Sequence, residues 1–446
     1  MKLLLFSLCT CPLLLIVHAE SPKKSGDARA STLSPSEPTL SLNAVTESVL
    51  ARNPSIKEAR AKWEAMKQRV PQARAWEDLK VSGSSLLGRF VQIGPNGFAD
   101  QMLTVEQMIP ISGKNQSRAR MAAAEALGAW EDIRRKEFDV VAKARASFFR
   151  LAKDYALFEL IRANESSLHQ TFDISRAKFE VGGQSQAEVL TAENEVTKNE
   201  EARHDLLRSI SEDETQLKVL MNRDPFAPLG KPVVSMPDAA HEHLAVDHFR
   251  ALIFSNRPEV RMAEAGITGA KAKLELARRE WIPDPAISIE AQRYNGGSQA
   301  VSELSAGISI SVPWLNGKKY RAEETEAQNG VEAAQHALDS ARTEALGLLR
   351  DQLQKIETFH HHVELFGEKL IPTARQTVDA NRANYESGKA TFLELELSQR
   401  SLFDLESMLR EHRADYEMAL AELEAIVGAD LNLFSPGQET LKRKTK

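Results

Sequence analysis

The spacing of apolar residues changes along the chain from a helical period to an alternating one and back, and this succession occurs twice. Leu42 to Arg74 has helical spacing, broken at Asn53-Pro54, where the residue before a proline resists the α conformation. Leu244 to Arg279 has the same spacing, with its break at Asn256-Arg257-Pro258. The pattern therefore predicts two broken helices that open two equivalent halves of the chain.

An alternating pattern follows each opening helix. From Leu304 to Val312, apolar residues alternate with Ser and Gly, and residues 286–293 alternate in the same way. These segments predict two strands, joined by turn residues at 295–297. We expect this strand pair within about 285–315, and a less regular pair of the same kind within about 79–111.

Long helices are predicted beyond each strand pair. Gln116 to Glu180 and Tyr320 to Glu386 contain almost no Gly or Pro, and as continuous helix each would measure on the order of 100 Å. Each stretch ends near a glycine, Gly182 or Gly388, which takes positive φ at no steric cost. A hydroxyl residue and a Glu three positions later then predict a capping box that restarts the helix, as Ser185 with Glu188 and as Thr391 with Glu394.

Each glycine thus marks the turn of a helical hairpin, and the returning arms run from Gln186 to Met221 and from Phe392 to Val427. In the second arm apolar residues recur every seven positions, which is coiled-coil spacing. They are Leu395, Leu402, Leu409, Tyr416 and Leu423. Arg203 interrupts the stripe of the first arm. Pro372 predicts a kink or a break in the second outgoing helix.

The equivalent landmarks indicate a tandem duplication. Gly388 follows Gly182 by 206 residues, and Pro313 follows Pro110 by 203. The predicted organisation is a signal peptide at 1–19, a flexible N-terminal lead at 20–40, a first repeat at 41–222, an inter-repeat linker at 223–243, a second repeat at 244–428 and a C-terminal tail at 429–446.

Composition and charge narrow the class of protein. The formal net charge of −6, from 57 basic and 63 acidic residues, does not favour nucleic acid as a partner. An apolar run from Leu3 to Val17, followed by a small-x-small pattern, predicts a secretory signal cleaved after Ala19. Cys9 and Cys11 both lie inside it. No later stretch is apolar enough for a transmembrane helix, so any entry into a membrane would use strands.

In their order, these landmarks resemble the TolC family of outer-membrane efflux proteins over about Ser41 to Gly428. The two hairpin turns match the tip motif of that family, and residues 279–285, Arg-Glu-Trp-Ile-Pro-Asp-Pro, match its usual lead into the strands. Residues 74–78 of the first repeat lack those prolines. With Ser185 and Thr391 in place, the tips are most similar to the cation-efflux branch.

The resemblance implies a mainly α fold with a small β part. Long antiparallel helical hairpins would form an α-barrel, and four strands per chain would contribute to a twelve-stranded outer-membrane β-barrel of a homotrimer. The chain would be a passive duct located in the outer membrane and spanning into the periplasm, the channel component of a tripartite efflux pump for small molecules or metal cations.

The resemblance also implies partners: a periplasmic adaptor (membrane fusion) protein, an inner-membrane pump of the RND type, and outer-membrane lipid. Two alternatives stay open, namely the duct of a type I protein secretion system and a secreted coiled-coil structural protein without a pore. The sequence contains no HExxH and no Gly-x-Ser-x-Gly motif, so we expect neither an enzyme nor a cofactor.

The hairpin turns supply the candidate functional residues. The expected docking positions for the adaptor are Gly182, Ser185, Glu188, Gly388, Thr391 and Glu394. Acidic residues beside the turns could attract cations to the entrance of a duct, although solvated positions on its wall are the alternative. These are Glu180, Glu386 and Glu396.

Histidines raise the question of a metal site. His360, His361 and His362 are consecutive, and His241, His243 and His248 lie elsewhere in the sequence. Because consecutive helical residues point about 100° apart, the three cannot all meet one ion, and a solvated helix face is the preferred interpretation. His412 lies on the adjoining heptad seam, between Leu405 and Ala419, where we expect a buried residue that is hydrogen-bonded or sets the register.

Overall fold

In the computed structural model, residues 39–86, 99–233, 246–294 and 300–431 are described, and they belong to a single unit that spans Pro38–Lys446. The following predictions concern residues outside this set: the signal peptide, most of the N-terminal lead, residues 234–243 of the linker, the turn at 295–297 and the tail beyond residue 431.

The first repeat forms the predicted succession of elements. They are α1 (Leu42–Arg52), α2 (Pro54–Arg74), β2 (Lys80–Ser85), β3 (Ala99–Met108), α3 (Lys114–Glu180) and α4 (Gln186–Leu220). The predicted break at Asn53 is confirmed. Its side chain accepts a hydrogen bond from the Ser55 backbone N–H (2.9 Å) and donates one to the Leu220 carbonyl (2.8 Å), so it starts α2 and holds the end of α4.

The second repeat has the same order. Its elements are α5 (Val246–Asn256), α6 (Pro258–Arg279), β5 (Ala286–Tyr294), β6 (Glu303–Ser309), a 3₁₀ turn (Pro313–Asn316), α7 (Gly317–Leu365), a π turn (Phe366–Leu370), α8 (Ile371–Glu386) and α9 (Phe392–Val427). The bounds of α9 are those predicted for the second returning arm.

The expected interruption at Pro372 is a change of helix type rather than a break. The Ile371 N–H bonds to the Phe366 carbonyl, five residues back, in the π turn that joins α7 to α8. A proline has no N–H to donate, and its ring collides with the carbonyl four residues earlier in an α-helix. The wider π turn relieves that collision, and the helix continues.

The last two residues of the predicted flexible lead are structured. Thr39–Leu40 form β1, which pairs in parallel with β4 (Lys231–Pro232) of the linker. The Val233 N–H donates to the Leu40 carbonyl at 2.9 Å. Backbone hydrogen bonds therefore tie the start of the first repeat to the segment that leaves it.

Four strands form one antiparallel sheet in the order β2-β3-β5-β6, so each predicted pair is confirmed and β3 with β5 joins the repeats. Directly opposed residues share a face of a sheet. One face carries Val81, Leu103, Val105, Ile287, Ile289, Leu304 and Ile308, and the other carries Lys80, Glu106, Ser288, Glu290, Gln292 and Ser305. The sheet thus has one apolar and one polar face.

Pairing ends earlier in β6 than the alternating pattern does. Ser309, its last residue, lies opposite Ala286, the first residue of β5, and Pro285 precedes that residue. A proline cannot donate to the ladder, so residues 310–312 have no further partner on β5.

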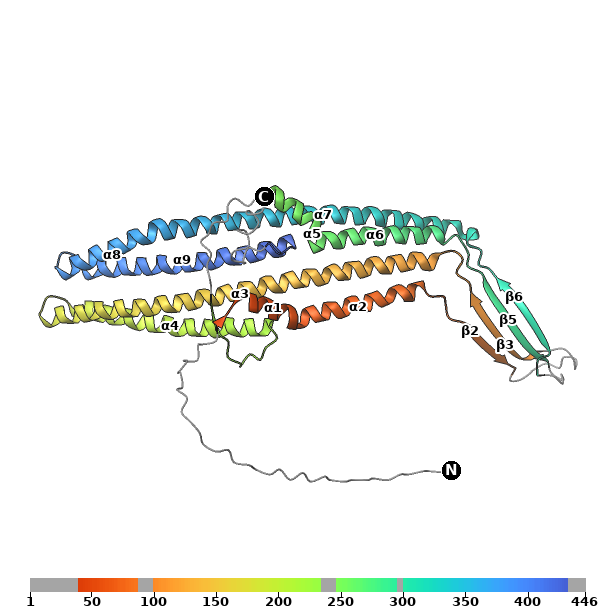
Figure 1. Ribbon diagram of the computed structural model, residues 1–446, viewed down its shortest axis with the longest axis horizontal. Coiled ribbons are helices and arrows are strands. Elements are labelled where there is room, and N and C mark those ends of the chain that lie inside the picture. The colour runs from red at the N-terminus through yellow and green to blue at the C-terminus, as the bar shows by residue number, and fades with distance from the viewer. Residues whose placement is uncertain (1–38, 87–98, 234–245, 295–299, 432–446) are drawn as a thin grey trace, which may run out of the picture. The chain divides into compact units, whose positions relative to one another are not determined.

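The helices bury the same positions in both repeats. Val45, Val49 and Ile56 lie in one core cluster, and their equivalents in the second repeat, Phe249, Ile253 and Val260, lie in the other. The sheet lies at one end of the helices and the turns between α3 and α4 and between α8 and α9 at the other end (Figure 1). In the part of the chain that the structure describes, none of the helices combines the length and apolar character needed to cross a membrane.

Candidate functional site

The two hairpin turns, tip 1 (residues 178–188) and tip 2 (residues 384–394), have the same backbone. Gly182 and Gly388 have φ of 76° and 74°. The Gly183 N–H donates to the Lys178 carbonyl at 2.9 Å, and the Lys389 N–H donates to the Asn384 carbonyl at 2.8 Å. Both are Schellman motifs, so the predicted left-handed glycine is confirmed in each repeat.

The N-terminal caps of the two helices that follow these glycines are not alike. In tip 2 the Thr391 N–H donates to Glu394 Oε2 (2.7 Å), and the Glu394 N–H donates to Thr391 Oγ1 (3.3 Å), which completes the predicted capping box. In tip 1 the Glu188 N–H donates to Ser185 Oγ at 3.4 Å, and no return bond forms from the Glu188 carboxylate among the described residues. Only half of the predicted box is present in tip 1.

Tyr385 joins the two tips. Its ring is buried, and its hydroxyl donates to Gln184 Oε1 (2.8 Å) and lies 3.1 Å from Ser175 Oγ. The Lys178 ammonium donates to the Tyr385 carbonyl and lies 3.7 Å from the centroid of the tyrosine ring. Gln184 directly precedes Ser185, the N-cap residue of α4. A residue of the second repeat therefore contacts tip 1 next to its incomplete capping box.

Further polar contacts between the repeats lie along the helices beside the tips. Gln399 Nε2 on α9 donates to Thr171 Oγ1 on α3 (3.2 Å), and Arg382 on α8 donates to Ser167 Oγ on α3 (3.1 Å). We call the contacts of α3 with α8 and α9 the inter-repeat seam. The sequence candidates did not include these residues. A comparison of the two repeats could have identified Tyr385 from the sequence, because the equivalent position of the first repeat is Phe179, which lacks the hydroxyl.

The acidic candidates beside the tips are placed separately. Glu180 ends α3 and pairs with Arg176 at 3.3 Å, with both side chains mostly exposed. Glu386 ends α8 and is exposed, whereas Glu396 lies half-buried on α9. Glu394 is engaged in its cap, and hydrogen bonds from the Thr391 backbone and then from its hydroxyl lower the pKa of that carboxyl.

The histidine tract points in three directions, as its spacing predicts. The His360 ring lies 5.9 Å from the Tyr416 ring, His361 is exposed, and the His362 ring lies 4.6 Å from the His412 ring. Within the described ranges, no group of three or more His, Cys, Asp or Glu side chains is arranged to hold a metal ion. His248 lies beside Phe249, while His241 and His243 fall outside the described residues.

His412 is half-buried between α7 and α9, next to Phe366 as well as His362. The Nδ1 atoms of His412 and His362 are both buried without a hydrogen-bond partner in the described structure, so the expected hydrogen bond at His412 is not formed at this atom. Burial, and then the neighbouring His362, lower the pKa of His412. Its ring contacts the rings of His362 and Phe366 at the start of the π turn.

The seam also has contacts at the middle of the helices. Arg145 on α3 forms a buried ion pair with Glu424 on α9, and Arg134 donates to the Gly428 carbonyl at 3.2 Å. Burial raises the pKa of Glu424 although Arg145 lowers it. Nearer the sheet, Asp284 accepts hydrogen bonds from the backbone N–H and from the hydroxyl of Ser112, both at 2.7 Å.

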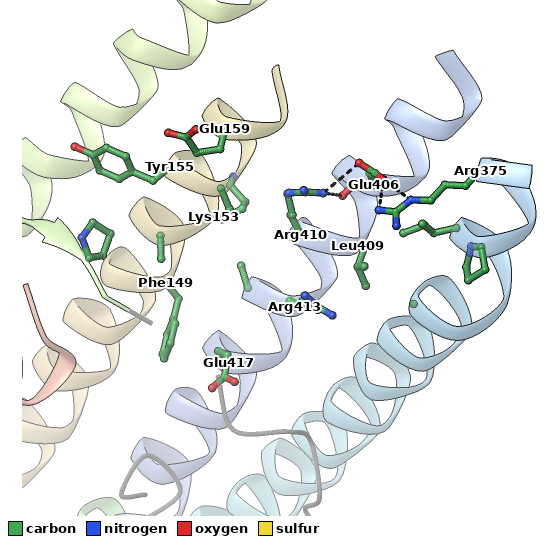
Figure 2. A pocket seen from close by; sticks show the side chains of 17 residues that line it. Phe149, Lys153, Tyr155, Glu159, Arg375, Glu406, Leu409, Arg410, Arg413 and Glu417 are labelled. Atoms are coloured by element: carbon green, nitrogen blue, oxygen red, sulfur yellow. Dashed lines mark hydrogen bonds and ion pairs between the residues drawn. The ribbon is translucent and has the colours of Figure 1, made fainter. Parts of the chain in front are cut away.

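A cavity of about 620 Å³ lies in the seam (Figure 2). Its apolar walls include Phe149, Tyr155, Ile371 and Leu409. Its charged lining residues are Lys153, Glu159, Arg375, Glu406, Arg410, Arg413 and Glu417. Residues from α3 of the first repeat thus face residues from α8 and α9 of the second across one space.

Known proteins share this architecture. The sequence profile of the outer membrane efflux protein family matches residues 45–223 and again residues 251–429, once in each repeat. The alkaline protease secretion protein AprF of Pseudomonas aeruginosa is 24% identical over 345 residues, covering 74% of this chain and 71% of that protein.

Two further comparisons agree with this match. The toluene efflux pump outer membrane protein TtgI of Pseudomonas putida is 22% identical over 362 residues, covering 76% of this chain and 71% of that protein. The outer membrane protein VceC of Vibrio cholerae has a similar structure, with a TM-score of 0.73 and 18% identity over 87% of this chain and 96% of that chain. The long hairpins and the small sheet are therefore a recurrent fold.

Proposed function

This chain belongs to the outer membrane efflux protein family, and we propose that it is the outer-membrane duct of a tripartite export assembly. The observation that carries the proposal is that the two ends of each repeat have different structures. One end supplies half of a sheet with an apolar and a polar face, and the other end supplies a helical hairpin that ends in a tip. A duct through a membrane and a periplasmic space needs both parts.

The sheet supports assembly of several copies. Its edges, β2 and β6, have no further strand paired to them among the described residues, and lipid does not tolerate an open edge. Closure therefore requires strands from other chains. We propose a homotrimer of twelve strands, in which the apolar face contacts lipid and the face with Glu106 and Glu290 lines the water-filled lumen.

The tips are the proposed contact with a periplasmic adaptor, through Gly182, Ser185 and Glu188 in tip 1 and Gly388, Thr391 and Glu394 in tip 2. An inner-membrane pump of the RND type would supply the energy, and this chain would conduct passively. Efflux of small molecules or metal cations is the first proposal for the cargo. The relative AprF is named for the secretion of a protease, so export of a protein is the second.

Two measurements test the proposal. The purified chain should migrate as a heat-stable trimer and should conduct ions in a planar bilayer. A chain released in soluble form without detergent, with no conductance, would instead support the coiled-coil scaffold without a pore. Deletion of the gene separates the two cargoes, because efflux predicts sensitivity to small toxic molecules or metals, whereas secretion predicts loss of a protein from the medium.

A further inference from the structure

The cavity occupies a gap in the inter-repeat seam. On its sheet side Arg145 pairs with Glu424, and on its tip side Thr171 contacts Gln399. These two contacts are separated by nearly the same length of α3 as of α9, so the helices keep one antiparallel register across the gap. The side chains that would meet in this interval face a cavity of about 620 Å³ instead. That volume is typical of sites for small organic ligands.

Positive charge gathers at one wall of the cavity. Figure 2 shows Glu406 between two arginines, with Arg375 NH2 2.6 Å from Glu406 Oε1 and Arg410 NH1 4.0 Å from Oε2. Arg413 forms neither a hydrogen bond nor an ion pair within the described part of the chain. Burial lowers the pKa of Arg410, the neighbouring Glu406 raises it, and Arg413 and Arg375 lower it by smaller amounts. One carboxylate therefore faces three cations.

The remaining charged residues of the cavity do not neutralise this wall. Lys153 pairs with Asp154 at 3.1 Å, and Glu159 is exposed and pairs with Arg162 at 3.6 Å. Glu417 is only 7% exposed and has no hydrogen-bond partner among the residues described. Burial raises the pKa of Glu417 to about 7, so its carboxyl takes up a proton at a much higher pH than an exposed glutamate does. A protonated Glu417 adds no negative charge and can donate a hydrogen bond.

We propose that this cavity binds an organic anion, with its carboxylate or sulfonate among Arg375, Arg410 and Arg413 and its apolar body against Phe149 and Leu409. Guanidinium groups are suited to planar anions, and the apolar walls favour an organic ligand over an inorganic ion. Such a ligand touches both repeats and fills the gap in the seam. The proposal is independent of the duct function, because binding to the purified chain requires neither an adaptor nor conductance.

Calorimetric titration of the full chain in nanodiscs of zwitterionic lipid tests this site. The probes are 1-naphthoate, the uncharged 1-naphthamide and inorganic phosphate, with empty nanodiscs as the blank. We expect 1-naphthoate to saturate one site per chain and to bind roughly tenfold more tightly than 1-naphthamide, because a charge-assisted contact is lost in the amide. Equal binding of the amide, tighter binding of phosphate, or no saturable binding of 1-naphthoate would each overturn the proposal.

Variants locate the site. Arg413→Gln should weaken 1-naphthoate binding about tenfold, and Arg375→Gln, whose side chain is mostly exposed, should weaken it by a smaller factor. Arg400→Gln is the matched control, because Arg400 is an exposed arginine of the same helix as Arg413 and does not line the cavity. Circular dichroism verifies that each variant is folded. Unchanged affinity in folded Arg413→Gln and Arg375→Gln proteins would contradict the site.

Acidity provides a second readout. Raising the pH from 6 to 8 ionises Glu417 inside the cavity, so binding of 1-naphthoate should fall several-fold. The other charged groups that face the cavity are Lys153, Glu159, Arg375, Glu406, Arg410 and Arg413. The Glu417→Gln variant separates Glu417 from them, because it should bind equally well at both pH values. Binding by the unaltered chain that does not change with pH would show that the anion does not lie near Glu417.

Discussion

The two tips share one backbone turn and differ in the side chains that secure it. Both contain a left-handed glycine in a Schellman motif. Tip 2 has a complete capping box and contributes Tyr385, whereas tip 1 has half a box and is contacted at Gln184 by that tyrosine. Duplication thus preserved the geometry of the turn and left its stabilisation unequal. Tip 2 has the more complete cap of its own, and Tyr385 of tip 2 contacts tip 1 at both Lys178 and Gln184.

Removing what the tips share should have the greatest effect. Gly182→Val together with Gly388→Val should abolish export and leave assembled chains in the outer membrane. A β-branched residue at φ near 75° is strained, and an added Cβ meets nothing within 4 Å at either glycine, so the strain acts on the turn alone. The measurement is export by cells that carry the double variant.

A control accompanies that experiment. Gly330→Val places the same side chain in α7, where an added Cβ also meets nothing within 4 Å and the backbone is helical. It should leave export intact. Normal export by the tip double variant would show that the turn geometry is dispensable for function.

The next effect concerns the contact that joins the tips. Tyr385→Phe gives tip 2 the residue that tip 1 has at the equivalent position and removes the hydrogen bonds to Ser175 and Gln184. A buried hydrogen bond contributes about 1 kcal/mol, so amide exchange at Gly183, whose N–H donates to the Lys178 carbonyl in the turn of tip 1, should accelerate several-fold. The reciprocal variant, Phe179→Tyr, should change little. If exchange is unaffected by Tyr385→Phe, tip 1 does not depend on tip 2.

A smaller effect tests the unequal caps. Thr391→Ala and Ser185→Ala each remove an N-cap, which contributes about 1 kcal/mol to helix stability. Thr391→Ala should accelerate amide exchange in the first turn of α9 more than Ser185→Ala does in the first turn of α4, because only Thr391 also contacts the carboxylate of its Glu. Equal changes in amide exchange in the two variants would mean that the hydrogen bonds from Thr391 to the Glu394 carboxylate do not stabilise the start of α9.

The weakest effect is a pH dependence confined to tip 2. The pKa of Glu394 is lowered in the folded protein by hydrogen bonds from Thr391, so its stabilisation is present above the ordinary pKa of 4.5 and is lost as the pH falls through the lowered value. Relative to tip 1, exchange at the start of α9 should accelerate in acid. Glu394→Gln should remove this dependence, and a dependence that survives in this variant would assign it to another group.

Local signals made much of the fold predictable. Asn53-Pro54 and Gly388 with Thr391 act through their own backbone and their near neighbours, so the end of α1 and the turn into α9 follow from a few adjacent residues. The alternation of Leu304 to Val312 likewise predicted a strand that is polar on one face. Helix ends and strand faces are short-range properties, and a sequence displays them directly.

The candidate site was predictable only in part. Tyr385 and Ser175 are 210 residues apart, and their contact depends on how one hairpin lies against the other. The cavity depends on side chains that fail to meet across the seam, which no local pattern encodes. The position of the π turn before Pro372 was predictable from the sequence, but its type was not. A proline predicts an interruption without specifying whether the helix bends or widens.

The equivalent core positions of the two repeats bear on the symmetry of the assembly. A ring built from six separate copies of one repeat would have sixfold symmetry, and any substitution would alter all six subunits at once. Joining two repeats in one polypeptide lowers the proposed ring to threefold symmetry. A tyrosine on alternate hairpins then becomes a permitted mutation, and neighbouring hairpins can evolve into donor and recipient of the same contact.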